Sequence, residues 1–400
     1  MKRRDFFKTA AVVGAATVGS SAFGSSVAMR EPIDSRKPQK INFPEKRPMI
    51  THSNRPPLLE APRSTFSQVI TPNDEFFVRW HLPEIPTLID TEKYAIKISG
   101  NVAKPYELTL RKLKEDFEQI EVTAVVQCGG NSRSAFVPIT GGVQWGSGAM
   151  GCAKWKGVRL KDVLKRAGMK ADSHWVNFNG MEKPAYDKTP DFVRELNLDE
   201  LNEDVMIAYQ MNDEDLPYLN GFPTRLIVPG YYSDSWVKMI KDIVVTKDHT
   251  PLFFMDKAYR IAANATHGET PDHLAKMTKP ITRMNIKSFI GFPDDGAEVE
   301  FQSQLVVRGV TFDGGIGVEK VLISLDNGKT WEEAMLGIDN GRYAYRAFRF
   351  SFRPNKKGKL SIMAKAIDYL GNEQPLAKDV PWDRGGYMFN GIDMVTIKIV

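Results

Sequence analysis

The stretch Val125-Val-Gln-Cys-Gly-Gly-Asn-Ser-Arg133 decides the fold of this chain. The apolar run at 122–126 predicts a buried strand that ends at Cys128. Gly129-Gly130 then allows a sharp turn, because glycine accepts backbone angles closed to other residues. Arg133 follows five residues after the thiol, and a nearby cation favours the thiolate, which is the form that binds metals. Taken alone, the stretch fits a metal site about as well as a packed cysteine near a surface arginine.

The surrounding sequence favours the metal site. Cys-Gly-Gly-Asn-Ser-Arg resembles the Cys-x-Gly-Asn-x-Arg signature of the sulfite oxidase family of molybdopterin enzymes. Further segments are similar to other blocks of that family and follow in the same order, at 76–83, 145–151, 155–164, 220–230 and 236–238. The resemblance runs from about residue 73 to the C-terminus. It implies an α+β fold, with a sulfite-oxidase-type molybdopterin-binding domain followed by an all-β, immunoglobulin-like sandwich domain.

Hydrophobic periodicity agrees with a mixed first domain. Alternating or continuous apolar runs predict strands at 94–98, 175–178, 205–209, 225–228 and 240–246. Apolar residues at helical spacing predict short helices at 110–117 and 160–167, and Gly168 is a good stop for the second of them.

Beyond residue 280 the pattern becomes purely β. Strands are predicted at 304–310, 319–325, 346–352 and 359–367. Asp326-Asn-Gly328 predicts a hairpin with a two-residue turn, because such turns need left-handed backbone angles. Regular short strands separated by turn signals favour a sandwich.

The division into segments follows from these patterns. Residues 1–28 hold a twin arginine, a weakly apolar run and a small-residue cleavage site, which indicates a twin-arginine signal peptide and export to the periplasm. Residues 29–72 are rich in proline and read as an extended arm without secondary structure. We expect the molybdopterin-binding catalytic domain at 73–259, a linker at 260–280 and the dimerisation domain at 281–400. An uncleaved membrane anchor at the N-terminus is the alternative for the leader.

Composition excludes several classes of function. The chain has 400 residues and a formal charge of +5, much of which lies in the leader, so no basic footprint for nucleic acid remains. No stretch reaches the length of a membrane span, and the mature protein is expected to have none. Gly146-x-Gly148-x-x-Gly151 matches a dinucleotide fingerprint only formally, because no helix pattern follows it. Of two cysteines, we expect Cys128 to be a ligand and Cys152 a packed residue.

The resemblance implies a Mo-molybdopterin cofactor with Cys128 as the ligand of the metal. The positions that match the pterin contacts of the family are Phe77, Arg79, His81, Asn220, Arg225, Ser235 and Lys238. Asn220 stands where a familiar member of the family has histidine, so it keeps a donor but loses the ring. Arg225 and Lys238 could be ordinary surface charges, but the apolar strands around them favour buried contacts.

Sulfite is a compact dianion, and the planar fork of arginine suits oxyanions. By resemblance, Arg79 and Arg133 match substrate arginines, and Tyr259 matches an active-site tyrosine. His81 could contact substrate, water or pterin, or simply be packed. Arg384 is the candidate for a further arginine from the second domain, although its register is one residue off.

The resemblance implies that the chain oxidises sulfite to sulfate and passes the electrons to a separate c-type cytochrome, because it carries no haem-attachment motif. It also implies a homodimer formed through the C-terminal domain. One alternative is a reductase of the same fold, of the methionine sulfoxide reductase catalytic-subunit type, although that relative lacks the β domain. The other alternative is a non-catalytic binding protein.

Overall fold

The computed structural model describes residues 43–400. The signal peptide expected at 1–28, and the first part of the arm expected at 29–72, lie outside these residues. Residues 40–400 form one compact unit, so the two expected domains can be described together.

The strand before Cys128 forms as expected and belongs to a twisted antiparallel sheet. It is β6 (Gln119–Gln127), and it pairs along its whole length with β7 (Met150–Arg159). The sheet continues through β10 (Met206–Met211), which pairs with both β11 (Glu214–Asp215) and β12 (Arg225–Ile227). The Gly146–Gly151 motif leads into strand β7, not into a helix, so the dinucleotide reading is correctly rejected.

A second sheet carries most of the other strands predicted for the first domain. Its order is β5 (Tyr106–Thr109), β4 (Ala95–Gly100), β13 (Ile240–Thr246), β8 (Trp175–Gly180) and β9 (Val193–Asn197). Residues in β4 alternate between buried and at least partly exposed positions, as the sequence pattern indicated, and the last four residues of β13, expected to be a buried strand, alternate as well.

Helices are short and few in the described part of the chain. They are α1 (Leu110–Glu115), α2 (Leu160–Arg166) and α3 (Phe253–Asp256). The predicted helices at 110–117 and 160–167 are therefore confirmed, and Gly168 follows the second with a left-handed φ of 65°. Because strands dominate, the fold is mostly β with few helices, and the expected α+β balance is corrected in that direction.

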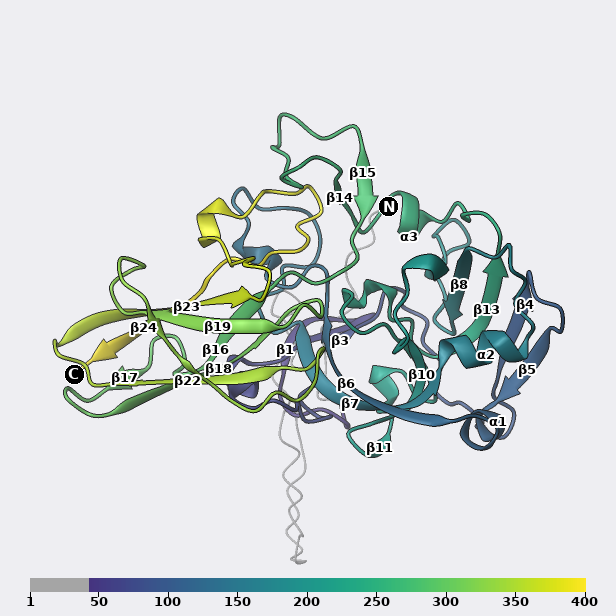
Figure 1. The fold of residues 1–400 in the computed structure, drawn as a ribbon, viewed down its shortest axis with the longest axis horizontal. Helices are drawn as coiled ribbons and strands as arrows, with labels where there is room; N and C mark the ends of the chain where they lie inside the picture. Colours follow the sequence, from purple (N-terminus) through teal and green to yellow (C-terminus); the bar gives the residue numbers. More distant parts are fainter. Residues whose placement is uncertain (1–42) are drawn as a thin grey trace, which may run out of the picture. The chain divides into compact units, whose positions relative to one another are not determined.

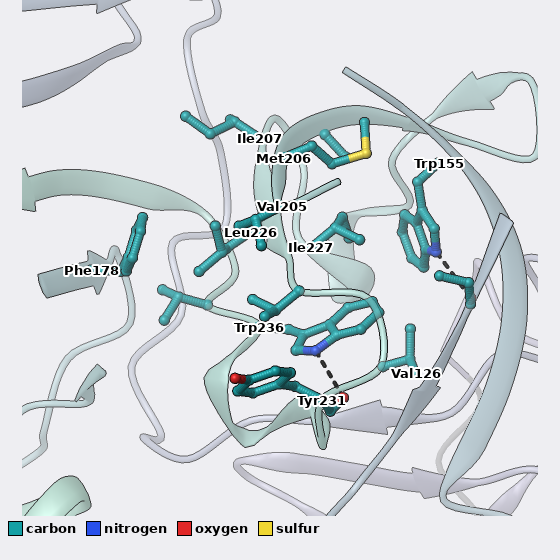
Figure 2. Close-up of a cluster of buried hydrophobic side chains, with 14 of the residues drawn as sticks. Val126, Trp155, Phe178, Val205, Met206, Ile207, Leu226, Ile227, Tyr231 and Trp236 are labelled. Carbon is teal, nitrogen blue, oxygen red and sulfur yellow. Dashed lines mark hydrogen bonds between the residues drawn. The ribbon is translucent and has the colours of Figure 1, made fainter. Parts of the chain in front are cut away.

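The first domain is held together by a large aromatic and aliphatic core (Figure 2). Trp155 on β7 and Trp236 meet edge to face, with ring centroids 6.2 Å apart. Each indole N–H finds a backbone acceptor, the carbonyl of Ala124 for Trp155 and that of Tyr231 for Trp236. Such pairing lets large amphipathic rings be fully buried. This core supports the strand ends from which the candidate site is built.

The expectation of an unstructured arm is wrong for its described part. β1 (Ile50–Asn54), β2 (Pro57–Glu60) and β3 (Val78–Arg79) form a small antiparallel sheet. Its prolines do not prevent this, because Pro57 stands first in its strand, where a missing N–H is tolerated. Leu58 and Leu59 are buried and anchor the sheet. The expected linker at 260–280 likewise begins and ends in paired strands, β14 (Arg260–Ala262) and β15 (Thr278–Pro280).

The second domain contains two sheets, drawn in green to yellow in Figure 1. One has the order β16 (Lys287–Phe292), β18 (Leu305–Phe312), β22 (Arg346–Phe352) and β21 (Met335–Leu336). The other has the order β17 (Glu298–Val299), β24 (Asp393–Ile399), β23 (Gly358–Asp368), β19 (Val318–Ser324) and β20 (Glu332–Glu333). A single apolar cluster draws residues from both sheets, so the sheets pack face to face.

The turn predicted at Asp326-Asn-Gly328 is present. The loop that contains it is longer than the two residues predicted. Asn327 and Gly328 both have positive φ, at 61° and 83°. However, the strands that flank them, β19 and β20, are separated by residues 325–331. The carboxylate of Asp326 accepts hydrogen bonds from the amides of Lys329 and Thr330, which stabilises the wider loop.

In the described residues, no helix is both long and apolar enough to cross a membrane.

Candidate active site

A cavity lies at the end of strand β6, and its empty space together with its solvent-filled mouth is about 470 Å³. Its walls come from segments that are far apart in the sequence, including the end of β3, the loop after β12 and the segment after α3. Of the predicted site residues, it brings together Phe77, Arg79, His81, Cys128, Asn220, Arg225, Lys238 and Tyr259. The predicted metal ligand and the predicted substrate and pterin contacts therefore share one space.

Cys128 stands at the wall of this cavity with its backbone fixed. Its amide donates to the carbonyl of Ala149, and its own carbonyl accepts the amide of Asn131, which closes the glycine turn. The two cysteines do not pair with each other, and both are buried. Burial raises the pKa of the Cys152 thiol to about 12, as expected for a packed residue outside the cavity.

Three cationic side chains line the cavity, those of Arg79, Arg225 and Lys238. The cavity lining has one carboxylate, that of Asp234. Arg225 is buried over the ring of Trp155, and burial lowers the pKa of its guanidinium to about 9, so it stays charged at neutral pH. Lys238 donates to the carbonyl of Arg79 at 2.7 Å, and burial lowers its pKa as well. A concave surface with this excess of positive charge attracts anions.

His81 and Tyr259 form a hydrogen-bonded pair, with imidazole Nε2 against the phenol hydroxyl. The imidazole stacks on Phe192 with centroids 3.5 Å apart. Burial, together with the positive charges of Arg79 and its neighbours, lowers the pKa of His81, so the ring is neutral. Burial raises the pKa of Tyr259, so its hydroxyl keeps its proton and can donate to an anion in the cavity.

A buried ion pair that the sequence analysis missed supports this corner. Arg194 donates to the carboxylate of Asp234 at 2.6 Å, and each side chain is only 1% exposed. The guanidinium also donates to the carbonyl of Phe254 and lies 5.2 Å from the ring centroid of Tyr259. Burial raises the pKa of Asp234 to about 6. Neither residue belongs to a local motif, and only the fold brings β9 next to the 3₁₀ helix Ser233–Ser235.

Arg133 is not among the residues that line the cavity. Its Nε donates to the carbonyl of Gly385 and its Nη1 to that of Val143, both at 2.9 Å. The guanidinium lies 5.2 Å from the ring centroid of Tyr387. A Cβ on Gly130 would come within 2.4 Å of it, so a side chain there would require the guanidinium to move. Arg133 thus ties the signature turn to the second domain.

Arg384 and Ser235 also lie outside the cavity lining. Arg384 forms an ion pair with buried Glu269 and donates to the carbonyl of Ala275. Ser235 lines a neighbouring cleft, beside Arg194, while its neighbour Ser233 lines the cavity. Direct roles for Arg133, Arg384 and Ser235 in binding substrate or pterin therefore stay predictions without support from these contacts.

The cavity fits a molybdopterin cofactor. Several of its buried polar atoms have no protein partner, among them His81 Nδ1, Arg225 Nε and Asp234 Oδ1. Within residues 43–400, no group of three or more histidine, cysteine, aspartate or glutamate side chains could hold a metal. The thiolate of Cys128 is a soft ligand that suits the molybdenum of such a cofactor.

Comparison with known protein families also indicates a molybdopterin site. Residues 81–254 match the family model of the oxidoreductase molybdopterin binding domain, and residues 278–399 match that of the Mo-co oxidoreductase dimerisation domain. Fold, site and family models together define a molybdenum oxidoreductase whose cofactor is Mo-molybdopterin.

The relatives specify the class further. The chain is 33% identical over 368 residues to the mitochondrial sulfite oxidase of Drosophila melanogaster, covering 87% of this chain and 63% of that one. It is 30% identical over 370 residues to the sulfite oxidase of Gallus gallus, covering 89% and 79%. The chain belongs to the sulfite oxidase family. The crystal structure of the sulfane dehydrogenase SoxCD from Paracoccus pantotrophus has the same fold, with a TM-score of 0.73 at 24% identity over 94% of both chains.

Proposed function

We propose that this protein oxidises sulfite to sulfate at the cavity beside Cys128. The observation that carries the proposal is the meeting of one buried thiol with three cations and a single, already paired carboxylate. That arrangement suits a soft metal and a small dianion at once. The sulfite oxidases named among the relatives support the same substrate.

Seven of the residues that line the cavity have a part in this reaction. Cys128 would hold the molybdenum, while Arg225, Lys238 and Asn220 would hold the pterin and its phosphate. The bound cofactor supplies an oxygen atom and accepts two electrons. Arg79 binds the anion and offsets its charge, because a guanidinium donates two bonds to an oxyanion. Tyr259 donates its hydroxyl to the bound anion, and neutral His81 orients that hydroxyl through its hydrogen bond.

The direct test is to add sulfite to the purified protein and record electron paramagnetic resonance. We expect a Mo(V) signal to appear and sulfate to form. A protein that contains molybdenum but gives neither signal nor sulfate would refute sulfite as substrate. In that case, reduction of sulfoxides under the same conditions would test the reductase alternative, which the match of residues 278–399 to the dimerisation domain disfavours.

We further propose that the electrons pass to a separate c-type cytochrome. A transient redox contact buries a small area, and its rate depends on salt through complementary charge. Stopped-flow mixing of sulfite-reduced protein with cytochrome c over a salt series tests this. Rapid reduction of oxygen, with no haem reduction at any ionic strength, would point to an oxidase.

The twin arginine near the N-terminus supports a periplasmic location. Changing Arg3→Lys and Arg4→Lys together should leave the activity in the cytoplasm, since this export route reads the arginine pair. Cell fractionation measures the outcome. Normal periplasmic activity of the double variant would mean that another route exports the protein.

The second domain is proposed to be immunoglobulin-like and to form a homodimer. Two sheets packed over one apolar core support the first part, and the match of residues 278–399 to a dimerisation domain supports the second. Analytical ultracentrifugation of the full chain distinguishes the outcomes, because a species of single-chain mass at micromolar concentration would contradict the dimer.

A further inference from the structure

The described chain begins with a short segment that lies outside the matched family domains and hydrogen-bonds to residues that line the cofactor cavity. We call residues 43–47 the strap; the match to the molybdopterin binding domain starts only at residue 81. Two neighbouring strap residues, Glu45 and Lys46, both contact residues of the loop 217–222. That loop carries Leu219 and Asn220, which line the cavity.

Lys46 joins two walls of the cavity through its ammonium group. Nζ donates to Asn220 Oδ1 at 2.6 Å, to the carbonyl of Asn73 at 2.6 Å and to that of Phe76 at 3.1 Å. All three donors of the ammonium are thereby used. Its acceptors are neutral oxygens, and burial lowers the pKa of Lys46 to about 8, so the group is mostly protonated at neutral pH. A buried lysine with this many internal bonds fixes the groups that it touches.

Glu45 binds the backbone of the same loop. One carboxylate oxygen accepts the amide of Tyr218 at 2.8 Å, and the other accepts the amide of Leu219 at 2.7 Å. These amides belong to the first residues of the 3₁₀ helix Tyr218–Asn220 and have no partner within it. The strap therefore fixes the backbone of the loop through Glu45, and it fixes the side chain of Asn220 through Lys46.

Asn220 transmits this constraint to two predicted cofactor contacts. Its side-chain Nδ2 donates to the carbonyl of Phe77 at 3.1 Å, and its backbone carbonyl accepts Nη1 of Arg225 at 2.9 Å. With Oδ1 bound to Lys46, the side-chain amide is engaged at both ends. The side chain of Asn220 thus links Lys46 to Phe77, and its backbone, in the loop that Glu45 fixes, holds Arg225.

From these contacts we infer that the strap retains the cofactor through two positioning residues: Lys46 keeps the Asn220 side chain and Phe77, and Glu45 keeps the loop backbone that holds Arg225, in the arrangement that binds the pterin. The inference rests on the Mo-molybdopterin site described above and extends it to residues outside the family domains. It concerns retention of the cofactor, so it holds whichever substrate the site oxidises.

The experiment compares loss of molybdenum from full-length holoprotein variants. Lys46→Met removes the ammonium but keeps an unbranched apolar chain, and Glu45→Gln keeps the shape of the carboxylate but removes its charge. Arg47→Met is the matched control from the same strap, because its guanidinium is 60% exposed and bonds only surface carboxylates of Asp74 and Glu75. Molybdenum is measured by mass spectrometry, and released pterin by fluorescence, during prolonged dialysis.

We expect Lys46→Met to lose molybdenum and pterin roughly tenfold faster than wild type, since it leaves three partly buried acceptors without a donor. Glu45→Gln should show a smaller acceleration in the same direction, and Arg47→Met should behave as wild type. Equal release from Lys46→Met, Glu45→Gln and Arg47→Met would overturn the inference.

Two further measurements separate the possible causes. Thermal unfolding of the cofactor-free proteins reports a purely structural role. If Lys46→Met only lowered that melting temperature and released cofactor at the wild-type rate, the strap would be structural and the inference wrong. Sulfite turnover by wild-type protein tests the proposed reaction independently, because a wild type that retains molybdenum yet leaves sulfite unchanged would refute the reaction and leave the release comparison intact.

Discussion

The cavity at Cys128 and the interior of the second domain are both buried, but charged side chains line the first and apolar side chains fill the second. Buried charges line the cavity at Arg225, Asp234 and Lys238, Arg194 is paired with Asp234, and several polar atoms of these residues have no protein partner. The interior of the second domain is a continuous apolar cluster between two sheets. Burying charge costs free energy unless it is compensated, whereas burying apolar surface stabilises. The difference teaches that the walls of the cavity are shaped for a charged ligand, whereas the interior of the second domain serves to stabilise the fold.

The largest expected effect falls on the cavity. Cys128→Ser replaces the soft thiolate by a harder oxygen, so sulfite oxidation should fall at least ~100-fold, as even changes outside the ligand shell can reach that size. Turnover and molybdenum content are measured on the same sample. Cys152→Ala is the control, since that cysteine lies outside the cavity. Wild-type turnover in a molybdenum-replete Cys128→Ser protein would remove the thiol from the reaction.

The complementary change falls on the second domain. Phe348→Ala truncates a side chain that is 2% exposed in the apolar cluster, so the free energy of unfolding should fall by about 3–5 kcal/mol. Denaturant unfolding of that domain checks the loss, with exposed Arg349→Ala on the same strand as control. Molybdenum per folded molecule should be unchanged at low temperature. If Phe348→Ala lost cofactor without losing stability, the apolar cluster of the second domain would serve cofactor binding, which contradicts the contrast between the two regions.

A third comparison separates two arginines that the sequence treats alike. Arg79 lines the cavity, so Arg79→Met should raise the KM for sulfite by roughly 10- to 100-fold, the value of a charge-assisted bond of about 1.5–3 kcal/mol. Arg133→Met should change the KM less, because its guanidinium bonds Gly385 and Val143 outside the cavity lining. Steady-state kinetics over a salt series measures both. A larger KM change for Arg133→Met would place Arg133 at the substrate after all.

The smallest expected effect is a titration in the second domain. Hydrogen bonds from Thr330 hold the pKa of the Asp326 carboxyl at about 2, below its ordinary value of 3.8. Because the folded pKa is the lower one, the stabilisation is complete above about pH 4 and is lost as pH falls toward 2. Nuclear magnetic resonance of the carboxyl over that range checks the value. A midpoint at the ordinary pKa would mean that the loop at 325–331 is not closed by Asp326.

The regular strands were predictable because their burial repeats locally. The strands expected at 240–246 and 346–352 coincide with β13 and β22, since apolar or β-branched residues recur there at a period of two. The sheet β1-β2-β3 was missed, because proline is read as a breaker unless its place at a strand start is known. The length of the loop after β19 was missed because the hydrogen bonds of Asp326 decide it, not the Asn-Gly pair alone.

The site residues that belong to a family sequence motif could be predicted from the sequence. Cys128, Arg79 and Tyr259 were found by resemblance, and the structure brings them to one cavity. Arg194 and Lys46 were not found, because each acts through a partner far along the chain, Asp234 for Arg194 and Asn220 for Lys46. No local pattern marks such a residue, since the fold alone decides which groups meet.

The segment 385–388 has a consequence for how such proteins can evolve. It belongs to the second domain, yet the amide of Met388 donates to the carbonyl of Gly129, next to Cys128. The ring of Tyr387 also lies against that of Tyr259, with centroids 5.3 Å apart. A recombination that exchanged the second domain for that of a distant relative would therefore also exchange part of the wall around the signature turn. The two domains are expected to be inherited as a pair, and a chimaera should work only if its donor supplies an equivalent of this segment.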